Sequence, residues 1–140
     1  MAALTITASS VAWVSGPTEI GTAGEAFAAG VSLYRAANGS WYKAQADGTT
    51  IEAGEYGYGL ALATADAAGA KVGVALPGAI VTLGTGTAAI VYCPGTAAGS
   101  WVPIADLVTT TQKVTPAAVG VGTSRVLLLS GAYNAGSVVP

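Results

Sequence analysis

Apolar and polar residues alternate in short runs along much of this chain, the periodicity expected of β-strands with one buried face. Residues 4–8 read Leu-Thr-Ile-Thr-Ala, and residues 11–14 read Val-Ala-Trp-Val with a looser alternation. The 20 glycines are scattered through the chain, and each would cost a helix about 1 kcal/mol relative to alanine. The pattern therefore predicts an all-β protein, and residues 61–70 are the one stretch that could form a helix instead.

Pairs of strands are predicted from runs that end at glycine, proline or asparagine. The clearest is a hairpin in which strand 31–35 turns at Asn38-Gly39 and returns as strand 41–44, because Asn-Gly favours the positive φ angles of a tight turn. The other predicted pairs are 57–63 with 71–76, 89–93 with 101–105, and 119–122 with 125–129.

The two halves of the chain resemble each other. The similarity is seen in two pairs of segments. Residues 31–34 (Val-Ser-Leu-Tyr) match residues 89–92 (Ala-Ile-Val-Tyr) in pattern, and Gly-Ser-Trp occurs at both 39–41 and 99–101. Short strands separated by glycine and proline are typical of a small barrel or sandwich. The expected parts are an extended N-terminal arm at 1–20, a duplicated β domain at 21–131 with halves at about 21–82 and 83–131, and a C-terminal tail at 132–140. The sequence leaves open whether the halves share one barrel or form two lobes.

The composition is unusually poor in charge. Charged residues make up 9% of the chain and hydrophobic residues 52%, whereas charged residues reach about 25% in typical soluble domains. This favours a surface partly buried in subunit interfaces, where no charge must be desolvated; a surface that is simply uncharged is the alternative. The five basic residues do not cluster and the net charge is −2, so nucleic-acid binding is not expected. The longest apolar run, residues 72–83, is too short and interrupted to span a membrane.

The sequence offers little for catalysis or metal binding. It has no histidine, which excludes His-based triads and imidazole metal sites, and its single Cys93 lies in an apolar run as a predicted core residue. Glu52 and Glu55 flank a glycine turn and are expected in solvent. Asp47 and Asp106 occupy matching places in the two halves, which favours a repeated turn cap over catalysis. We therefore expect neither enzyme activity nor a cofactor.

The three tryptophans have different expected roles. Trp41 and Trp101 follow Gly-Ser in matching positions, so we expect both to anchor the core rather than to stack on a ligand. Trp13 lies outside the repeated part, where an aromatic side chain either docks on a partner or folds back on its own domain. The candidate interface residues are Leu4, Ile6, Val11, Trp13 and Val14.

Two pairs of segments follow a pattern met in a known family. Residues 29–34 followed by 39–44, and residues 57–61 followed by 71–78, resemble the repeated unit of bacteriophage head decoration (capsid cement) proteins. The resemblance covers about residues 20–131. It implies an all-β fold, trimers on the outside of the capsid, and no catalysis or cofactor. It also implies that the major capsid protein is the partner and that binding reinforces the shell.

The expected function is thus that of a virion structural protein, a homotrimer made in the host cytoplasm and located on the outer capsid surface. Weak apolar contacts suit this role because symmetry multiplies them through avidity, and heterologous contacts between copies can close into rings. The alternative is a trimeric head- or tail-fibre module that binds a host surface glycan. A small hydrolase would require the scattered carboxylates to converge in space.

Overall fold

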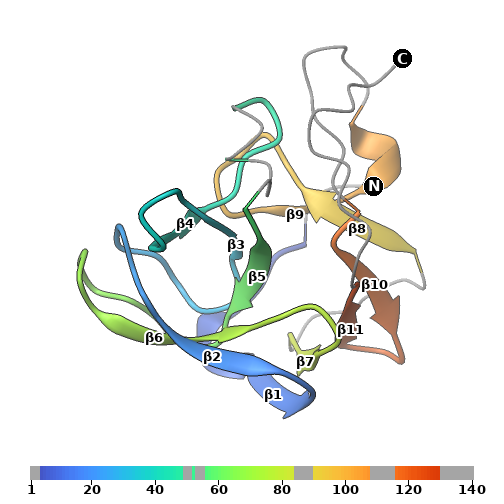
Figure 1. Cartoon of the computed structure of the whole chain (residues 1–140). Coiled ribbons are helices and arrows are strands. Elements are labelled where there is room, and N and C mark those ends of the chain that lie inside the picture. The colour runs from blue at the N-terminus through green and yellow to red at the C-terminus, as the bar shows by residue number, and fades with distance from the viewer. Residues whose placement is uncertain (1–3, 49–51, 53–55, 84–89, 108–115, 130–140) are drawn as a thin grey trace.

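The computed structural model describes residues 4–48, 52, 56–83, 90–107 and 116–129, which form two antiparallel sheets (Figure 1). The five-stranded sheet consists of β2 (Thr18–Thr22), β3 (Ser32–Arg35), β4 (Trp41–Lys43), β5 (Tyr58–Ala61) and β6 (Lys71–Ala75). The six-stranded sheet consists of β1 (Ala12–Ser15), β7 (Ile80–Thr82), β8 (Val91–Pro94), β9 (Trp101–Pro103), β10 (Ala118–Val121) and β11 (Arg125–Leu128). The short 3-10 helices are η1 (Ala8–Ser10) and η2 (Ile104–Asp106). The predicted all-β class is confirmed, and residues 61–70 contain no helix.

Both sheets repeat one strand order. The five-stranded sheet runs β2-β6-β5-β3-β4, and the six-stranded sheet runs β7-β11-β10-β8-β9 with β1 added beside β7. We call β2 to β6 the first unit and β7 to β11 the second unit. All four predicted strand pairs form, namely β3 with β4, β5 with β6, β8 with β9, and β10 with β11. The strand β7 falls at the end of the predicted first half (about 21–82), yet it pairs with β11 and lies in the second sheet.

The hairpin between β3 and β4 forms as predicted, but its turn differs in detail. Gly39 has a positive φ of 86°, whereas Asn38 does not. Instead, the Asn38 side-chain oxygen accepts a hydrogen bond of 2.9 Å from the Ser40 amide. The asparagine therefore stabilises the turn through its side chain rather than through a left-handed backbone.

One hydrophobic cluster joins the two sheets. It combines Tyr58, Leu60 and Ala75 of the first unit with residues of the second unit. The second-unit members are Ala79, Val81, Leu83, Tyr92, Trp101, Ala117, Ala118, Val126 and Leu128. Contacts of this kind between facing sheets are the core of a β-sandwich.

A second cluster covers the opposite face of the five-stranded sheet. It contains Leu33, Trp41 and Val74 from the strands and Phe27 and Ala65 from the connecting loops. The two loops are themselves joined, because Phe27 and Ala65 form an isolated antiparallel bridge. This sheet is therefore buried on both faces, which explains why all four residues of β5 are buried.

The sheet edges of the first unit approach each other without closing a barrel. Ala23, just after β2, forms an isolated parallel bridge with Trp41 of β4, and the Gly24 amide donates to the Trp41 carbonyl at 2.8 Å. Among the described strands this contact does not extend into a ladder, and the two sheets remain separate. Of the two predicted architectures, the sandwich is the one that forms.

Apart from the 3-10 helix η1, the described N-terminal segment is extended, as expected, but it is part of the sandwich. β1 pairs with β7 and β2 pairs with β6, so both strands add to the sheets. Before them, the Leu4 amide donates to the Trp101 carbonyl at 2.9 Å. The described part of the predicted arm is therefore held by the body of the protein.

Candidate interaction surface

The five predicted interface residues separate into two groups. Leu4, Ile6 and Val11 are partly buried and pack against the cluster between the sheets. Trp13 and Val14 point outward, with 52% and 37% of their surfaces exposed. The first three thus contribute to the core, whereas Trp13 and Val14 are exposed.

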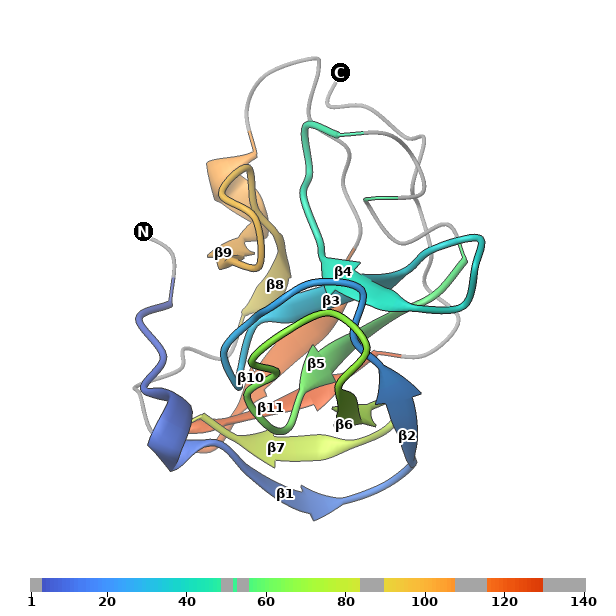
Figure 2. The ribbon, with the colours of Figure 1, turned by 90° about the vertical axis from the view of Figure 1, so that its left-hand side faces the viewer.

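β1 places Trp13 and Val14 at an open edge. The strand is the last one in its sheet, and in Figure 2 it lies along the lower border of the ribbon. All four of its residues are exposed and none is charged. The register of its pairing with β7 shifts between Trp13 and Ser15, and irregularities of this kind can redirect a side chain. The edge therefore presents apolar side chains together with unpaired backbone groups, which is the usual template for adding another strand.

The Trp13 indole is held in place although it is half exposed. Its Nε1 donates to the carbonyl of Gly16 at 3.2 Å. A side chain that is already fixed loses less conformational entropy when a partner covers it. Trp13 is thus suited to be an anchor of an interface, since tryptophan is enriched among the residues that dominate binding energy.

Ile20 is an exposed apolar residue that the sequence analysis missed. It lies in β2 with 78% of its surface exposed. An isoleucine in an alternating strand is normally assigned to the core, so Glu19 would be expected to face solvent. The structure reverses this assignment because Glu19 faces the sheet. We call residues 12–22, which comprise β1, the Gly16-Pro17 link and β2, the N-terminal ribbon.

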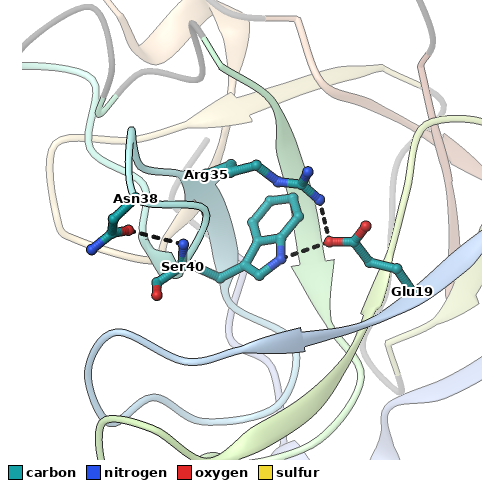
Figure 3. Close-up of polar contacts among 5 residues, drawn as sticks. Glu19, Arg35, Asn38 and Ser40 are labelled. Atoms are coloured by element: carbon teal, nitrogen blue, oxygen red, sulfur yellow. Dashed lines mark hydrogen bonds and ion pairs between the residues drawn. The ribbon is translucent and has the colours of Figure 1, made fainter.

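Figure 3 shows the polar cluster that orients β2. One oxygen of Glu19 accepts hydrogen bonds from the Arg35 guanidinium and from Nε1 of Trp41, the latter at 2.9 Å. The guanidinium carbon lies 4.7 Å from the centre of the Trp41 ring, so a cation–π contact adds to the ion pair. Because Glu19 is turned inward, its neighbour Ile20 is turned outward.

The buried tryptophans have the anchoring role that we predicted. Trp41 and Trp101 are 1% and 2% exposed. Their indole groups nevertheless bind different partners, since Trp41 donates to Glu19 within the first unit and Trp101 donates to the Gly30 carbonyl at 2.9 Å, across the junction of the units. Neither ring is free to stack on a ligand.

The described carboxylates do not gather into a metal site. Glu25 accepts a hydrogen bond from the Lys43 amide at 3.1 Å and lies 3.9 Å from its ammonium group. No group of three or more acidic, cysteine or histidine residues that could hold a metal ion occurs in the described part of the chain. Cys93 is fully buried, as predicted for a core residue. Glu55 lies outside the described residues.

A pair of tyrosines lies near two of these carboxylates. The rings of Tyr34 and Tyr42 stack with centroids 5.6 Å apart. Burial raises the pKa of the Tyr34 phenol, and the negative charges of Glu52 and Glu25 raise it further. The Tyr42 ring also lies directly against Gly24, where even a methyl group would clash with it. Protein contacts therefore occupy this ring, which limits its use as a platform for a sugar.

The cavities are small. One cavity of about 170 Å³ lies between the N-terminal segment and the junction of the units, lined by Leu4, Ile6, Gly30 and Trp101 among others. Pockets for small molecules usually measure about 300–1,000 Å³. The exposed ribbon is thus a stronger candidate for function than this cavity.

Comparison with known proteins finds no matching family model, no significantly similar curated protein and no significantly similar solved structure. In the described residues, no helix has both the length and the apolar character needed to cross a membrane. The resemblance to decoration proteins therefore stays a prediction, and the argument for function depends on the surface itself.

Proposed function

We propose that this protein is a non-enzymatic structural protein of a bacteriophage virion, which binds the outside of the capsid as a homotrimer and stabilises the shell. Its partner in this role is the major capsid protein. The observation that carries the proposal is the uncharged edge strand β1, all four residues of which are exposed and in which Trp13 is held in an orientation that a partner can cover.

The low charge of the chain supports this role. A decoration protein must bury part of its surface against the shell, and uncharged residues such as Ala12, Val14 and Ser15 can be buried without desolvating a charge. The contact that β1 of a single copy could make is small and therefore weak. Three copies bound at neighbouring positions would bind strongly together, because linked contacts multiply in avidity.

The contribution of Trp13 can be bounded from its exposure. A tryptophan side chain buries up to about 250 Å², and 52% of Trp13 is accessible. Covering roughly 130 Å² of apolar surface would contribute about 3 kcal/mol. This corresponds to a change in affinity of about 100-fold.

The test is cosedimentation of the protein with undecorated capsids of the phage that encodes it. We expect Trp13→Ala to weaken binding by up to about 100-fold. Tyr56→Ala is the matched control, because Tyr56 is also 52% exposed but lies outside the N-terminal ribbon. An absence of binding by the unmodified protein would overturn the proposed function. Equal losses of affinity in the two variants would mean that the N-terminal ribbon is not the surface that binds the capsid.

The alternative function, a fibre module that binds a host glycan, has less support. It requires an accessible aromatic face beside polar groups. The nearest arrangement among the described residues is the stack of Tyr34 and Tyr42, and the Tyr42 ring contacts both Tyr34 and Gly24. No observation favours a sugar at this place over the capsid contact proposed for β1.

A further inference from the structure

The two hairpins that carry Gly-Ser-Trp have loops of similar sequence in different surroundings. We call residues 36–40, between β3 and β4, the first loop, and residues 95–100, between β8 and β9, the second loop. Gly39 and Gly99 occupy matching places in them, with positive φ angles of 86° and 81°. A β-carbon on Gly99 would lie 3.0 Å from Cβ of Val31, whereas no described atom lies within 4 Å of the corresponding place at Gly39. The second loop is therefore covered by the first unit, and the first loop is open.

The open loop contains a chemically labile pair of residues. Asn38-Gly39 is the only Asn-Gly pair in the sequence, and the second loop has Ala98 before its glycine. Asparagine is a thermolabile residue, because the backbone nitrogen of the next residue can attack its side-chain carbonyl carbon. Glycine hinders this attack least, since it has no β-carbon beside that nitrogen. Both Asn38 and Gly39 are exposed, so water can reach the reacting groups.

The hydrogen bonds of the first loop activate one reacting group and restrain the other. The Ser40 amide donates to the side-chain oxygen of Asn38 at 2.9 Å, and Figure 3 shows the side-chain nitrogen directed away from Ser40. A donor in this place stabilises the negative charge that the oxygen gains when the carbonyl carbon is attacked. The Gly39 amide, which is the nucleophile, instead donates its hydrogen to the Ala36 carbonyl at 2.9 Å. Attack therefore requires local opening of this bond, not unfolding of the domain.

We propose that Asn38 is a site of spontaneous deamidation, at a rate set by local opening of the first loop. The Gly39 nitrogen forms a bond to Cγ of Asn38, and the side-chain NH₂ group leaves with the proton of that nitrogen as ammonia. The product is a cyclic imide. Water then adds to one of the two carbonyl carbons of the imide and breaks its bond to the nitrogen. One direction of opening gives aspartate, and the other gives isoaspartate, in which the backbone continues through the side-chain carbons. Water is the only co-reactant.

The two products have different effects on the hairpin. Aspartate leaves the backbone unchanged, and its carboxylate accepts from the Ser40 amide as the carboxamide does. Isoaspartate adds a carbon atom to the backbone of the loop, which alters the ring closed by the hydrogen bond from Gly39 to Ala36. The pairing of Arg35 with Trp41 begins directly after this loop, and Trp41 is buried. Isoaspartate therefore disturbs the start of β4 beside an anchor of the core.

The test is incubation of the full chain in mildly alkaline buffer, followed by mass spectrometry of the peptide that contains Asn38. We expect the mass change of NH₂ to OH and two products that chromatography separates. Each modified chain also gains one negative charge on the net charge of −2, so ion exchange measures the modified fraction. In urea, where the Gly39 amide is free, the reaction should be at least about tenfold faster than in the native protein. In the same urea solution, Gly39→Ala should slow it by about tenfold, because the β-carbon hinders the attack.

Ala98→Asn supplies the matched control. It places the sequence Asn-Gly-Ser-Trp in the second loop, and the exposed Ala98 can accept a larger side chain. There the Gly99 amide donates to the Ala44 carbonyl at 2.9 Å and the glycine is packed against Val31. In the native protein, the introduced asparagine should react at least about tenfold more slowly than Asn38. In urea the two asparagines should react at similar rates, because their neighbours in the sequence are then the only difference.

Urea midpoints distinguish the effects of the two products. Asn38→Asp should have nearly the midpoint of the unmodified protein, whereas the isoaspartate fraction of the incubated protein should have a lower one. No modification of Asn38 in the native protein, equal native rates in the two loops, or aspartate formed without isoaspartate would overturn the proposal. These measurements need no capsid, so their outcome is independent of the proposed function.

Discussion

The substitution Gly30→Ala tests whether the N-terminal segment belongs to the body of the protein or extends from it. Gly30 has a positive φ of 93°, and an added β-carbon would lie 2.5 Å from Cγ2 of Ile6 and 3.0 Å from Cγ2 of Val11. Gly39 provides a matched control with a similar φ of 86° and, among the described residues, no neighbour within 4 Å. The two alanine variants therefore share backbone strain and differ in the steric clash.

The expected magnitudes follow from these two effects. Placing alanine in the left-handed region costs about 1–2 kcal/mol, which is the whole expected loss for Gly39→Ala. Forcing an extra methyl group into a packed site costs about 1–3 kcal/mol. Gly30→Ala should therefore reduce the free energy of unfolding by roughly 2–5 kcal/mol, a large part of the 5–15 kcal/mol typical of a domain.

Urea denaturation of the single variants and of the double variant Gly30→Ala with Ile6→Ala measures the clash directly. Shortening Ile6 makes room for the new methyl group, so the double variant should be more stable than the sum of the single effects predicts. We expect a coupling of about 1–3 kcal/mol, within the range measured for contacting residues. Equal losses for Gly30→Ala and Gly39→Ala, with no coupling to Ile6, would mean that residues 4–11 do not rest on the body.

Two further predictions concern polar contacts of the core. Glu19→Gln should lower the free energy of unfolding by about 1 kcal/mol, because the amide oxygen still accepts from Trp41 while the ion pair with Arg35 is lost. Glu19→Ala should lower it by about 1–2 kcal/mol more, because it leaves the buried Trp41 N–H unpaired. Urea midpoints of both variants measure this difference, and equal midpoints would contradict it. Burial raises the pKa of the Tyr58 phenol, whose hydroxyl donates to the Leu129 carbonyl at 2.6 Å. The unfolded tyrosine therefore loses its proton first as the pH passes about 10. The stabilisation present below that pH is lost as the pH rises towards the pKa of the folded state. Tyr58→Phe should therefore flatten the decline in urea midpoint above about pH 10, and it should lower the free energy of unfolding by about 1 kcal/mol at neutral pH. An unchanged pH profile would contradict the role given to Tyr58.

Local sequence features predicted the strands well because the information for them is local. The Asn38-Gly39 turn and the alternating runs around it require only neighbouring residues, and all four predicted pairs of strands form. The repeated Gly-Ser-Trp segments also predicted two anchors, and both Trp41 and Trp101 are buried. The sequence did not distinguish a barrel from a sandwich, since the choice depends on which strands pair across the two units.

The candidate surface was predicted only in part. Of the five candidates outside the repeat, Trp13 and Val14 are exposed, whereas Leu4, Ile6 and Val11 pack on the core. Their alternation with polar residues showed that one face of the segment would be buried, and it did not show whether a partner or the same chain would bury it. Ile20 was missed because its outward direction follows from the contact of Glu19 with Arg35, residues that are distant in the sequence.

The sequence by itself determined the all-β class, the duplication, the positions of the hairpins and the shortage of charge, since each depends on composition or on neighbouring residues. Only the tertiary structure decided that the N-terminal segment joins both sheets, that Glu19 turns inward, and that one loop is covered while its counterpart is exposed. These outcomes depend on long-range packing between the units. Gly39 and Gly99 are both followed by Ser-Trp and have nearly the same φ, so their different surroundings follow from the asymmetric way in which one copy of the fold docks on the other.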